Sequence, residues 1–170
     1  MNRCSWRWAV IVWLACAPAW AQDNAEQVVS ATVLKSPQNK ENPIFAEIGD
    51  VLVVEQRKSE SLLVLTPLGR RGWVRNEDVV PLKDAAPVFN KLIADDPKDP
   101  WRYYSRALAY NAQGEKEKEL ADLTRAIDLK IDGATAWINR GAAYSTSGEY
   151  DKAIADYDEA IRRGYTGPSV

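Results

Sequence analysis

Few side chains of this 170-residue chain are suited to catalysis. It contains no histidine, and its two cysteines, Cys4 and Cys16, both lie within the first 21 residues. Histidine is the commonest general base and metal ligand, and the thiolate is the usual sulfur nucleophile, so both chemistries lack their usual groups. Serine, lysine, tyrosine and carboxylates remain, but no catalytic motif aligns them. We therefore expect no enzymatic activity, no cofactor and no metal site.

Two arginines, Arg106 and Arg140, recur at equivalent places, and so do two aspartates, Asp122 and Asp156. Each arginine could recognise an anion of a ligand, because a guanidinium binds carboxylates and phosphates through two parallel hydrogen bonds. It could instead pair with an aspartate of its own chain and tie two helices together. The ion pair is the favoured interpretation, since helix arginines are used more often in this way.

These residues belong to an internal repeat. When residues 100–133 are set against residues 134–167, a shift of 34, eleven pairs are identical. From Ala85 onward, apolar residues recur three and four positions apart, which indicates helices. Repeats of this length form helix pairs that stack on their neighbours, so we predict an all-α array here.

The second copy resembles the tetratricopeptide repeat family, whose period is 34 residues. Trp137, Gly141 and Tyr144 share one face of a first helix, and Gly148 allows the turn that follows. A second helix is marked by residues at helical spacing: Tyr150, Ala153, Ile154, Tyr157, Ala160 and Ile161. We expect the small Gly141 and Ala153 to lie where the two helix backbones approach closely.

The first copy is a looser match to the same family. Glu119 stands where the second copy has the small Ala153, and Ala107 takes the place of Gly141. Because a buried carboxylate is costly, we expect Glu119 to reach an edge or its helix pair to splay. A partial copy at residues 84–97 matches only a second helix, so the array would contain about two and a half repeats.

The resemblance implies that the first helices line a concave groove that binds a protein or peptide partner. The groove-facing residues would be Trp101, Tyr104, Leu108, Asn111, Thr135, Ile138, Ala142 and Ser145. Members of the family that clamp a terminal carboxylate use lysines and asparagines on this face. No lysine is present here, so an apolar partner segment is expected. Alternatively, Trp101 and Tyr104 pack on the preceding helix around Phe89 or on the N-terminal domain.

Stacked repeats normally end in a helix with a polar outer face. Here helix formation should stop near Arg163 and Gly164, with Pro168 following. Four explanations remain open: docking of a partner, self-association through this repeat, coverage by the N-terminal domain, or a shortened chain.

Residues 28–82 predict five short strands with no helical period among them. Gly49 and Asp50 before one strand, and the Gly-Trp-Val at residues 72–74, resemble bacterial SH3-like domains, which implies a small all-β SH3-like barrel. The proline and tyrosine that hold proline-rich ligands in eukaryotic relatives are replaced at residues 75–78, so such ligands are not expected. The domain would support the repeats or, as in some bacterial members, contact peptidoglycan peptides while the repeats recruit partners.

The first 21 residues have the order of a secretory signal. Arg3 and Arg7 precede an apolar run at residues 8–15, and small residues at positions 19 and 21 close it. The run is too short to span a bilayer. We expect cleavage after Ala21 and an exported protein, periplasmic or extracellular. Lipidation at Cys16, giving a membrane-anchored lipoprotein, is the alternative.

The charge balance argues against nucleic acid as a partner. The chain has 22 basic and 24 acidic residues, a formal net charge of −2, and no basic stripe. The predicted architecture is multidomain: a signal peptide at residues 1–21, a barrel at 28–82, a partial repeat helix at 84–97, and two repeats at 100–133 and 134–167.

Overall fold

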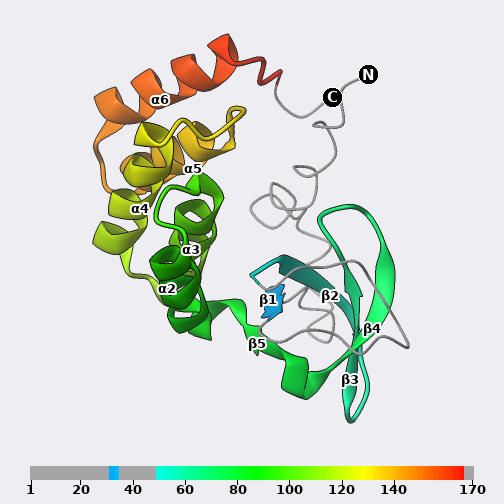
Figure 1. Ribbon diagram of the computed structural model, residues 1–170. Coiled ribbons are helices and arrows are strands. Elements are labelled where there is room, and N and C mark those ends of the chain that lie inside the picture. Colours follow the sequence, from blue (N-terminus) through cyan, green and yellow to red (C-terminus); the bar gives the residue numbers. More distant parts are fainter. Residues whose placement is uncertain (1–30, 35–48, 167–170) are drawn as a thin grey trace. The chain divides into compact units, whose positions relative to one another are not determined.

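The computed structural model of the protein describes residues 31–34 and 49–166 (Figure 1). The chain divides into two compact units, the first ending at Ala85 and the second beginning at Ala86. The expected signal peptide at residues 1–21, including Cys16, lies outside the described residues. Within the described ranges, no helix has both the length and the apolar character that crossing a membrane requires.

The first unit contains one antiparallel sheet of five strands in the order β4-β3-β2-β1-β5. Its strands are β1 (Ala31–Leu34), β2 (Val51–Arg57), β3 (Ser61–Leu65), β4 (Arg71–Arg75) and β5 (Val79–Pro81). The five strands expected from the sequence are therefore present. Two short 3₁₀ helices, at Asn76–Asp78 and Leu82–Asp84, flank β5.

The sheet is open in the part of the chain that the structure describes. There β4 pairs with β3 alone, and no pairing joins β4 to β5. The closed SH3-like barrel is therefore not confirmed. Strand periodicity and turn residues predict how many strands form, but closure depends on which sheet edges meet, and local sequence does not encode that contact.

Buried and less buried side chains alternate along β2 and β3, as expected for strands whose successive side chains point to opposite faces. One face of the sheet is therefore buried. The cluster on this face consists of Leu52, Val54, Leu62, Val64, Val74 and Val79. A bulge between Val54 and Gln56 shifts the register of β2 against β3. Such a bulge bends a strand and increases its twist locally.

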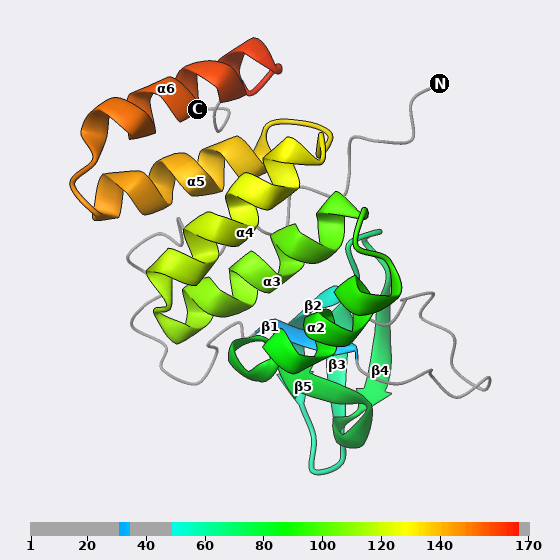
Figure 2. The ribbon, with the colours of Figure 1, turned by 60° about the vertical axis from the view of Figure 1, so that its left-hand side comes forward.

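The second unit is a row of five helices, each packed against the next (Figure 2). They are α2 (Ala86–Asp95), α3 (Pro100–Gln113), α4 (Lys116–Asp128), α5 (Thr135–Thr146) and α6 (Tyr150–Arg162). The helices α3 and α4 form one pair, α5 and α6 form a second, and α2 packs on α3. The prediction of a helical array after a β-rich region is confirmed.

The same turn joins the two helices of each pair. Gly114 and Gly148 have φ angles of 75° and 78°, in the left-handed region that glycine enters without a steric penalty. In each turn the amide of the next residue donates a hydrogen bond of 2.9 Å to the tyrosine carbonyl five residues earlier. This closure satisfies carbonyls that the end of the first helix would otherwise leave unpaired.

The close approach predicted between α5 and α6 is confirmed. A Cβ atom on Gly141 would lie 3.2 Å from the carbonyl oxygen of Ala153 and 2.9 Å from Cε1 of Tyr157. Contacts this short leave no room for a side chain at position 141. Glycine therefore permits the two backbones to meet.

The expectation for Glu119 is wrong. Its side chain does not reach an edge, since the residue is 4% exposed, and the helix pair does not splay, since α3 and α4 remain packed together. Asn111 explains how the carboxylate is accommodated, because its Nδ2 donates a hydrogen bond of 2.9 Å to Oε1 of Glu119. One oxygen of the carboxylate thus has a partner inside the helix pair.

Candidate interaction surface

All eight residues predicted to line a groove lie on α3 and α5, the first helices of the two pairs. The structure does not place them alike. Trp101, Leu108, Ile138 and Ser145 are half-buried, Asn111 and Ala142 are exposed, and Tyr104 and Thr135 are buried. The last two belong to the interior, so the predicted contact surface narrows to six residues.

Tyr104 is buried because it joins the two first helices. Its hydroxyl accepts a hydrogen bond of 3.0 Å from Nδ2 of Asn139 on α5. Its ring meets the Trp101 ring edge-on, with 5.7 Å between the ring centroids. Burial raises the pKa of the Tyr104 phenol well above its ordinary value. A neutral, bonded hydroxyl in this place fixes α3 against α5.

The six remaining residues form an apolar surface with few polar groups. Asn111 already donates to Glu119, so its amide is partly engaged within the chain. Trp101, Leu108 and Ile138 provide the large apolar area, and Ser145 provides one hydroxyl. A surface of this composition favours apolar side chains of a partner.

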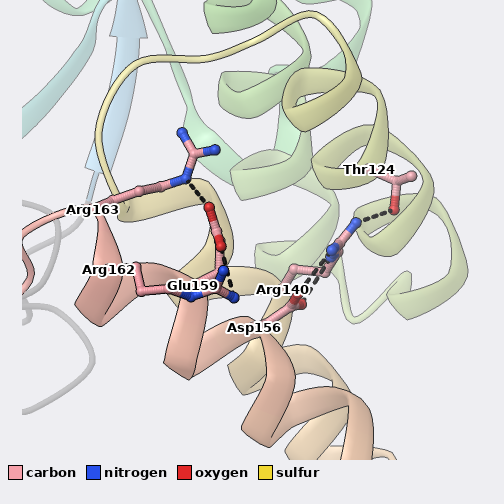
Figure 3. Close-up of polar contacts among 6 residues, drawn as sticks. All are labelled: Thr124, Arg140, Asp156, Glu159, Arg162 and Arg163. Atoms are coloured by element: carbon pink, nitrogen blue, oxygen red, sulfur yellow. Dashed lines mark hydrogen bonds and ion pairs between the residues drawn. The ribbon is translucent and has the colours of Figure 1, made fainter.

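Both recurring arginines bind the aspartate of their own helix pair, which confirms the ion-pair interpretation. Arg106 donates from Nε and Nη2 to the two carboxylate oxygens of Asp122, each at 2.7 Å. Arg140 binds Asp156 in the same way, at 2.8 and 2.7 Å (Figure 3). Each pair is largely buried and connects a first helix to its second helix.

A third contact connects each arginine to the preceding second helix. Nη1 of Arg106 donates to Oδ1 of Asn90 on α2 at 2.8 Å, and Nη1 of Arg140 donates to Oγ1 of Thr124 on α4 at 3.3 Å (Figure 3). Asn90 and Thr124 are themselves 34 positions apart. Sequence reasoning missed this role, although the 34-residue shift links the two positions despite their different residue types.

Aromatic rings complete the surroundings of each arginine. The Arg106 guanidinium lies 5.6 Å from the Tyr103 ring centroid and 5.8 Å from that of Tyr110. Arg140 lies 5.0 Å from Trp137 and 5.9 Å from Tyr144. The hydrogen bonds to aspartate raise the pKa of both guanidinium groups. The anion-recognition alternative has no support, because each nitrogen of both guanidinium groups already donates a hydrogen bond within the chain.

Glu119 is the one poorly satisfied group in this part of the fold. Its Oε2 is buried and has no hydrogen-bond partner among the described residues. Burial raises the pKa of the carboxyl, while the hydrogen bond from Asn111 and the charge of Lys116 oppose the rise. The first helix pair therefore buries a carboxyl group at the position where the second pair has Ala153.

Comparison with known proteins identifies the family of the second helix pair, α5 and α6. Residues 134–163 match the family described as Tetratricopeptide repeat. The DnaJ homolog subfamily C member 3 of Rattus norvegicus is 39% identical over 59 residues, which are 35% of this chain and 12% of that protein. The chain thus spans about one eighth of the length of this curated relative.

Solved structures are also similar to about half of this chain. MamA from residue 41 to its end, from Desulfovibrio magneticus RS-1, is 23% identical with a TM-score of 0.47, over 52% of this chain and half of that one. The second TPR of Spaghetti (RPAP3), bound to the HSP90 peptide SRMEEVD, is 26% identical with a TM-score of 0.46, over 48% of this chain and 76% of that one. Residues 134–163 are a tetratricopeptide repeat, within a unit of five stacked helices.

Proposed function

We propose that this chain is a non-enzymatic interaction module that binds an extended apolar segment of a partner protein along α3 and α5. The observation that carries the proposal is the surface on these two helices. Trp101, Leu108 and Ile138 are half-exposed there, on helices that the Tyr104–Asn139 hydrogen bond holds together. Tetratricopeptide repeats typically serve protein interaction, which agrees with such a surface.

The side chains of this surface predict how a partner is held. Tryptophan contributes much of the binding energy in many interfaces, because it buries a large rigid area. Trp101 is already oriented by its edge-on contact with Tyr104, so little conformational freedom is lost when a partner covers it. The predicted surface contains no charged residue, so its affinity should depend weakly on salt.

A photoreactive amino acid placed in the chain tests the surface in living cells. Ala142 is exposed on α5 within the proposed surface, and Ala121 is exposed on α4 and provides the matched control. We expect a defined cross-linked product from position 142 and none of that mass from position 121. The same product from both positions would contradict the proposal, and so would the absence of any product from position 142.

A paired substitution tests which side chains make the contact. Trp101→Ala combined with Ile138→Glu should abolish the cross-link from position 142 and leave the helical circular dichroism unchanged. Leu68→Glu, at an exposed apolar residue of the sheet unit, is the matched control and should retain the cross-link. A cross-link that survives the double substitution would refute the assignment of the surface.

We further propose that the sheet unit is an SH3-like domain that has lost its usual ligand site. The five antiparallel strands support this, as does the Trp73 ring, whose face is covered by the Lys58 ammonium at 4.0 Å from the centroid. Because Lys58 already covers this face of the Trp73 ring, a ligand cannot stack on it without displacing the lysine. The alternative, contact with peptidoglycan, predicts that residues 22–170 sediment with purified cell wall; unbound protein in the supernatant would favour a supporting role.

Export is also part of the proposal and is supported by the order of charge, apolar run and small residues in residues 1–21. Residues 1–30 fused to alkaline phosphatase should give an enzyme active outside the bacterial cytoplasm, and Leu14→Arg should abolish that activity. The mass of the processed chain then distinguishes cleavage after Ala21 from lipidation at Cys16. An intact, cytoplasmic fusion would refute export.

A further inference from the structure

The outward face of α6 carries an exposed apolar stripe. Tyr150, Ile154, Tyr157 and Ile161 are 65%, 58%, 37% and 62% exposed, and Tyr157 is the least exposed because its ring also lies against Gly141 of α5. Their spacing of four, three and four residues places them on one face of the helix. Among the described residues, four of the five exposed large apolar side chains are in this stripe. Exposed apolar faces of this kind are typical of surfaces that bind a protein, a ligand or a membrane.

The repeat shows what covers the same face elsewhere in the unit. Leu123 on α4 precedes Tyr157 by one repeat of 34 residues, and Phe89 on α2 precedes it by two. Each is only 1% exposed, because α3 packs on α2 and α5 packs on α4. The face of α6 is thus a third copy of a helix-binding face that is covered twice within the unit.

We call the contacts of α3 with α2 and of α5 with α4 the inner junctions. At each inner junction the covering helix contributes an arginine. Arg106 of α3 donates to Asn90 on α2, and Arg140 of α5 donates to Thr124 on α4. The next position in this series is Asp158 on α6, which is exposed and whose carboxylate makes no hydrogen bond or ion pair with the other described residues. A carboxylate therefore stands where the two inner junctions have neutral acceptors.

We propose that the α6 face binds an amphipathic helix of a partner protein and that an arginine of this helix pairs with Asp158. A guanidinium bound to a carboxylate forms a stronger hydrogen bond than one bound to the amide or hydroxyl oxygens at the inner junctions. Asp151 lies about two helical turns before Asp158, on the same side of α6, and is also exposed. Its negative charge adds to the attraction for a basic helix. The surface is separate from the one on α3 and α5.

A second copy of this chain is less suited to this site than another protein. The arginines of the helical unit at positions 102, 106, 140, 162 and 163 already pair with acids of their own chain. Figure 3 shows Arg162 and Arg163 both engaged by Glu159. A second copy that covered the face with its α3 or α5 would have to break one such pair, because Arg102, Arg106 and Arg140 are the arginines of these two helices. The exposed Arg125 lies on α4, whose own apolar face is covered by α5.

The experiment uses residues 22–170 as the target and a helical peptide as the probe. The probe is a fluorescein-labelled copy of residues 134–147, which contain α5 with Arg140, the helix that covers the equivalent face of α4. Because short isolated helices are marginal in water, the peptide is stapled between positions 142 and 146, both exposed in the protein. Binding is followed by fluorescence anisotropy.

We expect saturable binding that depends on the stripe and on Asp158. Ile154→Glu should abolish binding, and Asp158→Arg should weaken it at least about tenfold. A probe with Arg140→Glu should bind the Asp158→Arg protein better than it binds the unaltered protein, as a direct pair requires. Asp132→Arg makes the same charge change at an exposed position outside α6 and should alter the affinity less than about twofold.

Three outcomes overturn the proposal. One is the absence of saturable binding, and another is equal affinity for the unaltered and Asp158→Arg proteins. The third is a dimer of residues 22–170 in analytical ultracentrifugation that dissociates on Ile154→Glu, because a second copy would then occupy the face. Trp101→Ala should leave probe binding unchanged, so failure here and failure of the α3–α5 surface are distinguishable.

Discussion

The two helix pairs share their polar contacts and differ in what fills the space between their helices. In both, an arginine of the first helix binds an aspartate of the second through two hydrogen bonds. In the second pair the helices meet at Gly141 and Ala153, whereas in the first the carboxylate of Glu119 lies in the place of Ala153. The arginine–aspartate ion pair is therefore common to both helix pairs. The residue packed between the helices differs, and in the first pair it is even a buried acid.

Loss of an aspartate should have the largest effect. Asp122→Ala leaves the Arg106 guanidinium largely buried without its two main acceptors, and we expect about 3–5 kcal/mol less free energy of unfolding. Urea denaturation of residues 22–170, followed by circular dichroism, measures the change. A loss below about 1 kcal/mol would show that the pair does not hold the helices together.

The same change in the second pair sharpens the comparison. The main neighbour of α6 is α5, so Asp156→Ala should release α6 in a first transition while the other helices stay folded.

Replacing both Arg106 and Asp122 by leucine is the control for the first pair. This double substitution should recover much of the free energy of unfolding that Asp122→Ala loses, because no buried guanidinium is left without an acceptor.

The period of the sequence and its recurring residues predict much of the helical unit. Apolar spacing predicts the helices, and small residues 12 positions apart predict the close approach of Gly141 to Ala153. The Arg106 and Arg140 ion pairs follow because both partners recur with the same shift. These features are predictable because each is carried by residue types at fixed spacing.

Other features depend on contacts between residues that no local pattern connects. Tyr104 becomes buried through Asn139, which lies in the next copy, and Glu119 through Asn111, which lies on the opposing helix. Of the eight predicted surface residues, all lie on the expected helices, but their exposure depends on these cross-helix partners. Pairing between strands that are distant in the sequence is non-local in the same sense. Whether the sheet closes into a barrel therefore could not be predicted from local sequence.

A side chain at position 141 should have the next largest effect. Gly141→Val places atoms against the Ala153 carbonyl and the Tyr157 ring, and we expect a loss of about 2–3 kcal/mol in the free energy of unfolding. Ala142→Val changes the next residue, which is exposed, and should cost only the about 0.5 kcal/mol that helix propensity predicts. Equal losses would mean that the helices can separate without penalty.

Removing the acid of the first pair should stabilise the protein. Glu119→Ala reproduces the residue found at position 153 and removes a buried oxygen that lacks a partner. We expect a gain of about 1–2 kcal/mol in the free energy of unfolding near neutral pH, measured by urea denaturation. Glu117→Ala, at an exposed site on the same helix, is the matched control and should change the stability little.

The pH dependence of that gain has a defined sign. Burial raises the pKa of Glu119 in the folded protein above its value in the unfolded chain. The folded state therefore binds more protons, and stability decreases as pH rises through the interval between the two pKa values. The advantage of Glu119→Ala over the unaltered protein should therefore grow as pH rises above the ordinary glutamate pKa of about 4.3. A constant advantage would mean that the carboxyl titrates normally.

The turns should show the smallest effect and the closest agreement between the two pairs. Gly114→Ala and Gly148→Ala each place a Cβ at a positive φ angle in open space, so strain in the backbone alone should cost about 1 kcal/mol. Asparagine tolerates this conformation better, so Gly114→Asn and Gly148→Asn should cost less than the alanine variants. Thermal unfolding of the four variants measures the costs. Similar costs at both turns would place the turn among the shared features of the repeat, whereas a cost confined to Gly114 would mean that α6 adjusts its position when the turn is strained.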